Sequence, residues 1–409
     1  MLEDQTITLF SAVLLLGAVQ GAFLIFLVLG LRRGNRPANL FLASLLLLFV
    51  VDLLDEFSLT TGYYLNFPLL VAVNLALDFL LGPAIYLYTR AMTRQEASSR
   101  KDRLWPHFIP FGIALIIALT LVFQFTPDEF RQHIYAEEGP LGLDLASALM
   151  TIGGLISIGY YLIASLRLLV QHRRLIQNRF SYLERISLSW LRNLLLVLAS
   201  LYFVYLSAIG IDLWLDRTDQ WEDRLLYVAI VGAIYLIGIF GIRQPTVFRY
   251  RGQSKNGTDV ARQDEVLRLV ESDESADIEE EKYRKSALSY TQSVDLLVEI
   301  ERYMVEERPY LDNQLSLPEL ASQLSLSPNW LSQAINEVKK VNFFDFVNAY
   351  RVEEAQRLLA QAGEAKVNIL DIAMASGFNS KSAFYTAFKK FTGLTPSQFR
   401  RSLEQSHGQ

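Results

Sequence analysis

The sequence predicts an all-α protein in two parts, a seven-helix transmembrane bundle followed by a cytoplasmic domain with two helix-turn-helix units. Three observations carry this prediction. Long uncharged runs fill the chain as far as Gly241 and then stop. The segments between these runs alternate between rich and poor in Lys and Arg. A short apolar helix, a turn and a second helix then occur twice toward the C-terminal end.

Seven apolar runs are candidates for membrane spans, because a helix needs about 20 apolar residues to cross the hydrocarbon core of a bilayer. Five are uninterrupted. The run at Ala38–Leu54 contains Asp52, and the run at Tyr63–Tyr88 contains Asp78 and is bent at Pro83. The first run follows an acidic flank and is too long for a cleaved signal peptide. The uninterrupted runs are Ile7–Leu31, Phe108–Phe125, Leu145–Leu166, Asn193–Ile211 and Leu225–Ile242.

The charges of the connecting segments predict the orientation of the seven spans. Three segments on one side, Arg32–Pro37, Thr89–Leu104 and Arg167–Trp190, carry 13 Lys and Arg, whereas the segments on the other side carry 3. Positive charge is retained in the cytoplasm. The N-terminus is therefore expected outside a bacterial inner membrane and the C-terminus in the cytoplasm.

The composition excludes several chemistries. The chain has no cysteine, which excludes disulfides, cysteine-ligated zinc and thiol nucleophiles. Its four histidines do not have metal-ligand spacing, and no cofactor is expected. The last span contains no lysine that could hold retinal as a Schiff base. No catalytic residues are expected, and the chain is not predicted to be an enzyme.

Two polar residues inside the third span are candidates for a sensor site. Asp78 lies near the middle of the span and Asn74 one turn earlier on the same face. An ionisable residue within a span is a functional candidate. The alternative is that both side chains only form hydrogen bonds between helices. No motif identifies a ligand, so the signal is unknown.

A polar segment separates the two parts. Residues 244–288 are rich in charge and poor in apolar residues, which predicts a flexible linker. The following helix is expected over Ser289–Glu307, with Ser289 and Gln292 forming a capping box. The chain is thus divided into a membrane domain (1–243), the linker (244–288) and a C-terminal domain (289–409).

The C-terminal domain contains an internal repeat. Residues 316–338 and 369–391 each form a short apolar helix, a turn and a second helix that begins at a serine cap, Ser327 or Ser380. A single long helix over 342–361 joins them. This arrangement predicts two helix-turn-helix units at a defined separation.

The second helix of each unit has one apolar and one polar face. Phe384, Ala387, Phe388 and Phe391 form the apolar stripe of the second unit. Short polar side chains at helical spacing can reach base edges in a major groove, and lysines suit phosphates. The alternative is a solvent-exposed face of a structural helix. The candidate DNA-binding residues are Asn329, Ser332, Gln333, Asn336, Ser380, Lys381, Ser382, Tyr385, Thr386, Lys389 and Lys390.

The stretch IAMASGFNSKSAFYTAFKKFTGLTPSQFR resembles the signature of AraC/XylS-type transcription regulators. The matching residues are the Gly377-Phe378 turn, the Ser380 cap, the run from Phe388 to Lys390, Gly393 and Thr395-Pro396. The resemblance implies a domain whose two units contact successive major grooves. The layout of the chain resembles membrane-bound members of that family, in which transmembrane helices replace a soluble sensor. The first unit departs from the family, because Pro328-Asn329-Trp330 has no basic residue.

These observations predict a bacterial one-component transcription regulator, held in the inner membrane, that binds promoter DNA under the control of its membrane domain. Two alternatives stay open. The bundle could be only an anchor, with release by proteolysis at the linker. It could also be a transporter or membrane enzyme with a regulatory tail. The expected partners are double-stranded promoter DNA, the lipid bilayer, a second copy in a homodimer, an unknown ligand and RNA polymerase.

Overall fold

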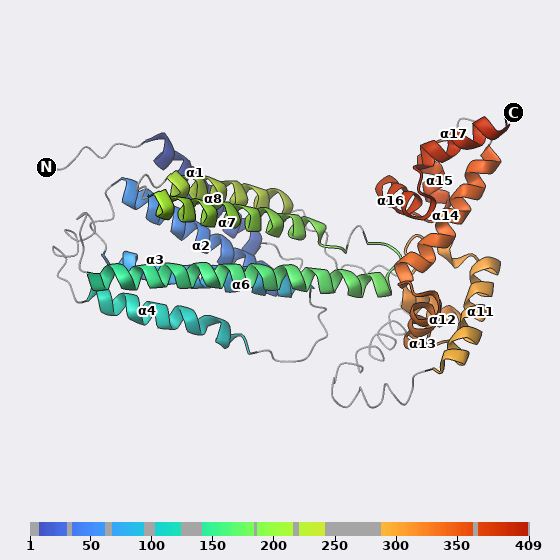
Figure 1. Cartoon of the computed structure of the whole chain (residues 1–409), viewed down its shortest axis with the longest axis horizontal. Helices are drawn as coiled ribbons and strands as arrows, with labels where there is room; N and C mark the ends of the chain where they lie inside the picture. Colours follow the sequence, from blue (N-terminus) through green and yellow to red (C-terminus); the bar gives the residue numbers. More distant parts are fainter. Residues whose placement is uncertain are drawn as a thin grey trace. The chain divides into compact units, whose positions relative to one another are not determined.

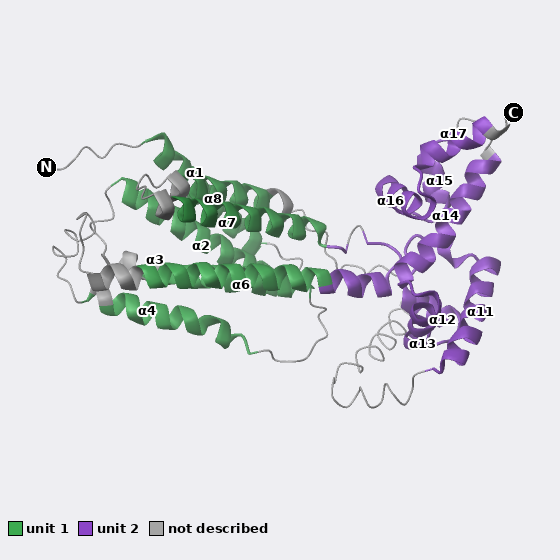
Figure 2. Ribbon diagram, viewed as in Figure 1, with its two compact units in different colours: residues 1–170, 188–249 green, residues 171–187, 250–409 purple. Residues whose placement is uncertain are grey.

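The computed structural model describes residues 8–30, 35–61, 68–93, 103–123, 141–183, 186–215, 221–241, 288–362 and 367–407. Within these ranges every regular element is a helix (Figure 1). The chain forms two compact units (Figure 2). Unit 1 comprises Met1–Val170 and Leu188–Arg249, and unit 2 comprises Gln171–Ser187 and Tyr250–Gln409. Unit 2 therefore takes in a segment that the sequence placed in a loop between two predicted spans.

Each of the seven apolar ranges contains a helix. Asn35 caps the second of them, because its side chain accepts a hydrogen bond from the backbone of Ala38. A short 3-10 turn, η2 (Trp105–Phe108), precedes the fourth. The fifth continues past Val170, so its last residues belong to unit 2. The helices are α1 (Leu9–Gly30), α2 (Arg36–Thr60), α3 (Pro68–Thr93), α4 (Ile109–Val122), α6 (Leu141–Arg179), α7 (Ser189–Leu215) and α8 (Trp221–Gly241).

Glycines allow the helices of unit 1 to pack closely. At Gly17 of α1, an added Cβ would lie 2.6 Å from Cγ2 of Val231 in α8. At Gly21, one turn later, it would lie 2.5 Å from Cγ2 of Val50 in α2. Small residues at helix contacts are typical of packing within membranes, where close van der Waals contact replaces the hydrophobic effect between helices.

Unit 1 also exposes many large apolar side chains. Leu16, Phe26 and Phe203 are 64%, 75% and 70% exposed. Large exposed apolar patches are uncommon on soluble monomers, whereas lipid solvates apolar side chains. Within the described residues, four helices are long and apolar enough to cross a membrane, and two apolar helices are shorter. The long ones are Leu9–Gly30, Arg36–Thr60, Ala148–Arg179 and Ser189–Ile211, and the short ones Trp105–Thr120 and Arg224–Gly238.

The starts of several helices of unit 2 are marked in the sequence by caps. The expected capping box is confirmed: Gln292 donates its backbone N–H to Ser289 Oγ and accepts the Ser289 N–H. Residues 244–287 of the predicted linker lie outside the described residues. The elements are α11 (Tyr290–Glu306), η4 (Pro309–Leu311), α12 (Leu317–Gln323), α13 (Pro328–Ala334), the π-helical turn η5 (Ile335–Lys339), α14 (Phe343–Ala362), α15 (Ile369–Ala375), α16 (Lys381–Thr392) and α17 (Pro396–His407).

Helix α14 contributes to two separate hydrophobic cores. Its first half, with Phe343 and Phe346, packs with α11, α12 and α13. Its second half, with Val352 and Leu359, packs with α15 and α16. One long helix thus carries two small helical groups, each with its own buried core, and the separation of the two groups is determined by the length of α14.

Candidate nucleic-acid interface

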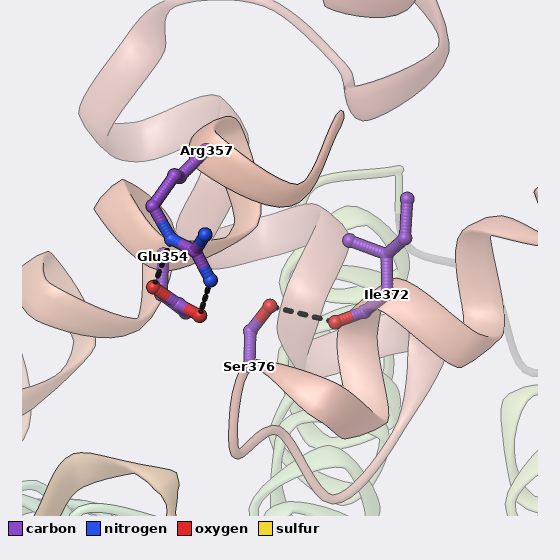
Figure 3. Close-up of polar contacts among 4 residues, drawn as sticks. All are labelled: Glu354, Arg357, Ile372 and Ser376. Carbon is purple, nitrogen blue, oxygen red and sulfur yellow. Dashed lines mark hydrogen bonds and ion pairs between the residues drawn. The ribbon is translucent and has the colours of Figure 1, made fainter. Parts of the chain in front are cut away.

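The turn between α15 and α16 depends on a glycine. Gly377 has a φ of +84°, and an added Cβ would lie 2.3 Å from the carbonyl oxygen of Tyr310. Only glycine fits both the left-handed backbone and the close approach. The preceding residue, Ser376, is buried and donates its hydroxyl to the carbonyl of Ile372 at 2.6 Å, as Figure 3 shows. The turn therefore has a single well-defined conformation from which α16 begins.

Helix α16 is oriented by its caps and its buried face. Ser380 accepts a hydrogen bond from the backbone of Ala383 at 3.2 Å and so begins the helix. Phe384 and Phe388 are fully buried against α14 and α15. Gly393, with a φ of +76°, ends the helix. The side of α16 opposite the two phenylalanines is therefore held toward the surface.

That surface carries most of the DNA-binding residues predicted for the second helix-turn-helix unit. Lys381, Ser382, Thr386 and Lys389 are exposed. Tyr385 is half-buried, with its hydroxyl 3.1 Å from Ser397 Oγ and its ring 5.5 Å from Lys381 Nζ. A shallow concavity is lined by Tyr385, Thr386, Lys389, Lys390 and Thr395. The structure thus brings hydroxyls and ammonium groups together on one face.

Lys390 differs from its neighbours because it has a protein partner. Its Nζ donates to Asp345 Oδ1 at 2.6 Å, which ties α16 to the start of α14. Asp345 accepts a hydrogen bond from Asn342 at its other oxygen. An ion pair of this kind positions the helix.

One part of the sequence prediction for this helix is wrong. Phe391 was expected to lie in the buried stripe of α16, but it is 41% exposed. The reason is that Phe391 lies in the last turn, where the helix runs past the core formed by Phe384 and Phe388. Lys390 Nζ lies 5.7 Å from the centre of the Phe391 ring.

The first predicted helix-turn-helix unit presents a smaller polar face. Ser327 caps α13 by accepting the Trp330 N–H, and Leu331 and Ala334 are buried. Asn329 and Asn336 are exposed and Ser332 is half-buried. Asn336 donates its side-chain N–H to Ser332 Oγ at 3.1 Å. These three residues occupy the surface of α13 and η5.

Gln333 has a different environment from the other residues of this set. Its amide donates to the carbonyl of Leu288 at 2.9 Å and accepts the Leu288 N–H at 3.1 Å. It also donates to Glu337 Oε2 at 3.0 Å. The amide therefore ties the start of α11 to α13.

An ion pair on α14 lies beside the second predicted helix-turn-helix unit (Figure 3). Arg357 donates from Nε to Glu354 Oε2 at 2.8 Å and from Nη2 to Oε1 at 2.5 Å. Glu354 is 8% exposed. The hydrogen bonds from Arg357 hold the pKa of Glu354 below its ordinary value, although burial acts in the opposite direction. The pair keeps the carboxylate ionised at neutral pH.

The predicted sensor residues lie at helix contacts of unit 1. Asn74 donates to Asp55 Oδ2 at 2.6 Å and thereby links α3 to α2. Asp78 faces α6, where an added Cβ at Gly154 would lie 3.2 Å from the Asp78 Cβ. Among the residues that the structure describes, no group of three or more His, Asp or Glu side chains is placed to hold a metal ion.

Comparisons with known proteins identify the C-terminal part of the chain. Residues 320–402 match the family described as a helix-turn-helix domain. The melibiose operon regulatory protein of Escherichia coli (strain K12) is 30% identical over 94 residues, which cover 23% of this chain and 30% of that protein. An uncharacterised HTH-type transcriptional regulator of Staphylococcus aureus (strain COL) is 37% identical over 91 residues, which cover 22% and 12%. The C-terminal part of this chain contains an AraC-type helix-turn-helix domain.

Two solved structures are also similar to this part of the chain. A protein of unknown function from Listeria innocua is 30% identical, with a TM-score of 0.23, and the match covers 26% of this chain and 94% of that one. The C-terminal domain of AraT, a response regulator from Geobacillus stearothermophilus, is 30% identical with a TM-score of 0.23, covering 25% and 84%. The match spans less than a third of each of the two curated relatives.

Sequence reasoning missed two residues that organise this site. Arg351 of α14 is 1% exposed, and burial lowers its pKa to about 10. Ser181 is equally buried and is bound to Arg351. An arginine on an otherwise amphipathic helix gives no sequence signal of burial, and Ser181 lies 170 residues away in the chain.

Proposed function

We propose that this chain is a transcription regulator held in the bacterial inner membrane, which binds specific promoter DNA in the cytoplasm. The observation that carries the proposal is the exposed polar face of α16 in an AraC-type helix-turn-helix domain. Homologues of that domain are named as transcriptional regulators. A helix whose apolar face is buried and whose polar face carries hydroxyls and lysines is suited to a major groove.

The proposed DNA-binding residues have two roles. Lys381, Ser382, Tyr385 and Thr386 would contact base edges, since their side chains carry hydrogen-bond donors and hydroxyl acceptors. Lys389 and Lys390 would contact phosphates, which position a protein without reading sequence. Ser380 would serve mainly as the cap of α16. In the first unit, Asn329, Ser332 and Asn336 would form a second contact, and Gln333 is left out of the proposed set.

Two helix-turn-helix units are proposed from the two cores along α14. The pair α12 and α13 would form the first unit, and the pair α15 and α16 the second. Because each pair has its own core on one half of α14, the two second helices are held at a constant separation. Such a domain suits two contacts in successive major grooves on one face of the duplex.

The membrane part of the proposal rests on the apolar helices of unit 1 and on the charge of its loops. Exposed leucine and phenylalanine side chains suit a lipid environment, and the basic segments suit the cytoplasmic side. The seven-helix domain would sense a signal through helix packing. The contacts of Asn74 with Asp55 and of Asp78 with α6 make these two residues the proposed sensor site.

The test of this function uses the whole chain in lipid nanodiscs. Genome-wide mapping of bound sites would first supply the promoter. The variants Thr386→Ala and Lys381→Ala should each lower specific affinity by about 5- to 100-fold, since a good base contact contributes roughly 1–3 kcal/mol. The exposed residue Gln405 of α17 supplies the matched control, Gln405→Ala, which should bind as the parent does. Unchanged promoter affinity in both α16 variants would show that another surface reads the DNA.

A further inference from the structure

The segment between α6 and α7 is bound within the same compact unit as the helix-turn-helix domain. Helix α6 ends at Arg179, and the next residue, Phe180, forms an antiparallel β-bridge with Ser316. Ser316 is the N-cap of α12, the first helix of the first helix pair. His172 of α6 and the carbonyl of Ile186, just before α7, approach to 3.2 Å. The residues directly after α6 therefore reach the start of α12.

Ser181 is bound on both its backbone and its side chain. Its N–H donates to the carbonyl of Leu315 at 3.2 Å, and its hydroxyl donates to the same oxygen at 2.6 Å. Its own carbonyl and hydroxyl oxygens accept hydrogen bonds from Arg351 at 2.9 and 3.0 Å. The side chain is 1% exposed. Ser181 therefore donates and accepts hydrogen bonds through both its backbone and its side chain, in a site that excludes water.

Arg351 depends on Ser181 for two of its hydrogen-bond acceptors. A guanidinium has five N–H donors and no acceptor, and a buried one is stable only when its donors are paired. Nε donates to Tyr310, Nη1 also contacts Asn348, and Nη2 also donates to Asp312, at 2.8, 3.3 and 2.7 Å. These partners supply three acceptors, and Ser181 supplies the other two. Departure of the segment would leave two donors of a buried cation without protein partners.

Arg351 also connects the two helix pairs. Its hydrogen bonds to Tyr310 and Asp312 hold the chain just before α12, and its guanidinium lies 5.9 Å from the ring of Phe378 in the turn before α16. The Cβ position of Gly377 lies 3.1 Å from Arg351 Nε. The side chain thus sits where the first pair meets the second, and its position bears on their separation.

We propose that Phe180 and Ser181 form a docking segment, by which the loop between α6 and α7 binds the DNA-binding domain of its own chain at Arg351 and Leu315. In the bound state the segment orders Arg351 and holds the two helix pairs at the separation that fits successive grooves. The inference rests on the proposed function for the DNA-binding role. Because α6 and α7 directly flank the segment, a change in the packing of these two helices acts on the docked residues.

The absence of natural cysteines makes docking directly measurable. The antiparallel register that pairs Phe180 with Ser316 brings Tyr182 toward Gln314, which is exposed. In native membranes, the full chain with Tyr182→Cys and Gln314→Cys should form an intrachain product with a short bifunctional maleimide. The control pair, Tyr182→Cys with Gln405→Cys on α17, should not. Equal yields from the two pairs, or products only between two chains, would overturn the proposal.

The effect on DNA is measured separately. Ser181→Ala removes the hydroxyl that Arg351 and Leu315 share, and it should lower promoter affinity of the full chain about tenfold, a typical effect for losing a hydrogen bond to a charged group. Affinity for unrelated DNA should not change, because no phosphate contact is altered. The matched control is Ser187→Ala in the same loop. The proposal is overturned if Ser181→Ala binds the promoter as the parent does, or if it loses both kinds of binding as an unfolded domain would.

The two experiments distinguish docking from DNA binding. If the Tyr182→Cys, Gln314→Cys chain gives the intrachain product and the parent chain binds no promoter, the docking segment stays in place and the proposed function is removed. If the parent chain binds its promoter and the double-cysteine chain gives no product, the proposed function stays and the docking segment is removed.

Discussion

At the residue scale, the proposed DNA contacts of α16 divide into side chains for base edges and side chains for the DNA backbone. Thr386 and Lys389 are both exposed and lie one turn apart or less on the same face. Thr386 has a short hydroxyl side chain suited to a base edge, and Lys389 has a long cationic one suited to a phosphate. The two roles predict different responses to salt, because only phosphate contacts release counterions.

Lys389→Ala is therefore expected to weaken binding to promoter and unrelated DNA alike and to reduce the slope of log affinity against log salt by about 1. Thr386→Ala should weaken promoter binding only and leave the slope as it is. Fluorescence anisotropy of the full chain across a salt series measures both. If the two variants exchanged these behaviours, the assignment of bases to Thr386 and phosphates to Lys389 would be wrong.

The Glu354–Arg357 pair predicts a dependence of stability on pH. The pKa of Glu354 is lowered in the folded domain, so its contribution is fully present above the ordinary pKa of 4.5 and is lost as pH falls through the lower folded value. Glu354→Gln should therefore unfold at lower urea concentration at pH 7, and the difference from the parent should shrink below about pH 4.

Urea unfolding of the full chain in nanodiscs, followed by circular dichroism from pH 3 to pH 7, would show this convergence. The matched variant is Glu353→Gln, whose carboxyl lies next to Glu354 in the sequence without the bidentate partner. A constant gap between Glu354→Gln and the parent at all pH values would contradict the role of the ion pair.

The exposure of the polar face of α16 could be predicted from its sequence, because Phe384 and Phe388 repeat at helical spacing. The roles of Gln333 and Arg351 could not. Gln333 has an amide side chain of the type that contacts base edges, but its partner, Leu288, lies 45 residues earlier. Arg351 is buried by segments from three distant parts of the chain. Periodicity shows which side of a helix is apolar, but it does not show what covers the remaining sides.

At the scale of elements, the two positive-φ glycines of the second helix pair have different surroundings. Gly377 is pressed against the Tyr310 carbonyl and Arg351, whereas Gly393 has no heavy atom within 4 Å of an added Cβ. A left-handed backbone costs an L-residue about 1–2 kcal/mol at either position. Only Gly377 adds a steric clash to that cost.

Gly377→Ala should therefore lower protection of α15 and α16 against amide hydrogen exchange by distinctly more than Gly393→Ala, which should lose about 1–2 kcal/mol. Both variants are compared in the full chain, so the environment is the same. Equal losses would mean that the close approach of the Gly377 turn to Tyr310 does not constrain the domain.

Helix starts were the most predictable elements, because local chemistry determines them. The capping box at Ser289 and the serine caps at Ser327 and Ser380 all appear in the structure. Helix ends were less predictable. Phe391 was placed in the core, and helix α6 extends to Arg179, well past the apolar run that ends at Leu166. A polar helix end depends on what it packs against, which the local sequence does not contain.

At the scale of the molecule, the sequence separates an apolar first part from a polar second part. In the structure, a segment from the first part belongs to the same compact unit as the second part. Residues 171–187 lie between two apolar runs of the sequence, but they are grouped with the helix-turn-helix domain. The proposed orientation places this segment and the domain on the same side of the membrane. Any account of signalling has to include this shared segment.

The orientation makes a prediction that the cysteine-free chain allows to be tested cleanly. A single cysteine at Gln132 should react with a membrane-impermeant maleimide in intact spheroplasts, because the segment that contains it is poor in Lys and Arg. A single cysteine at Ser254 should react only after the membrane is permeabilised. Labelling of Ser254→Cys in intact spheroplasts would place the C-terminal domain on the outside and would contradict the proposed orientation.

The central claim is that two helix pairs, held on α14, bind promoter DNA together. Hydroxyl-radical footprinting of the full chain in nanodiscs on its mapped promoter measures this most directly. The account predicts two protected stretches on one face of the duplex, about 10 base pairs apart, one for each successive major groove. Thr386→Ala should remove one of them and Asn336→Ala should weaken the other. A single protected stretch, or none on the promoter, would contradict the claim.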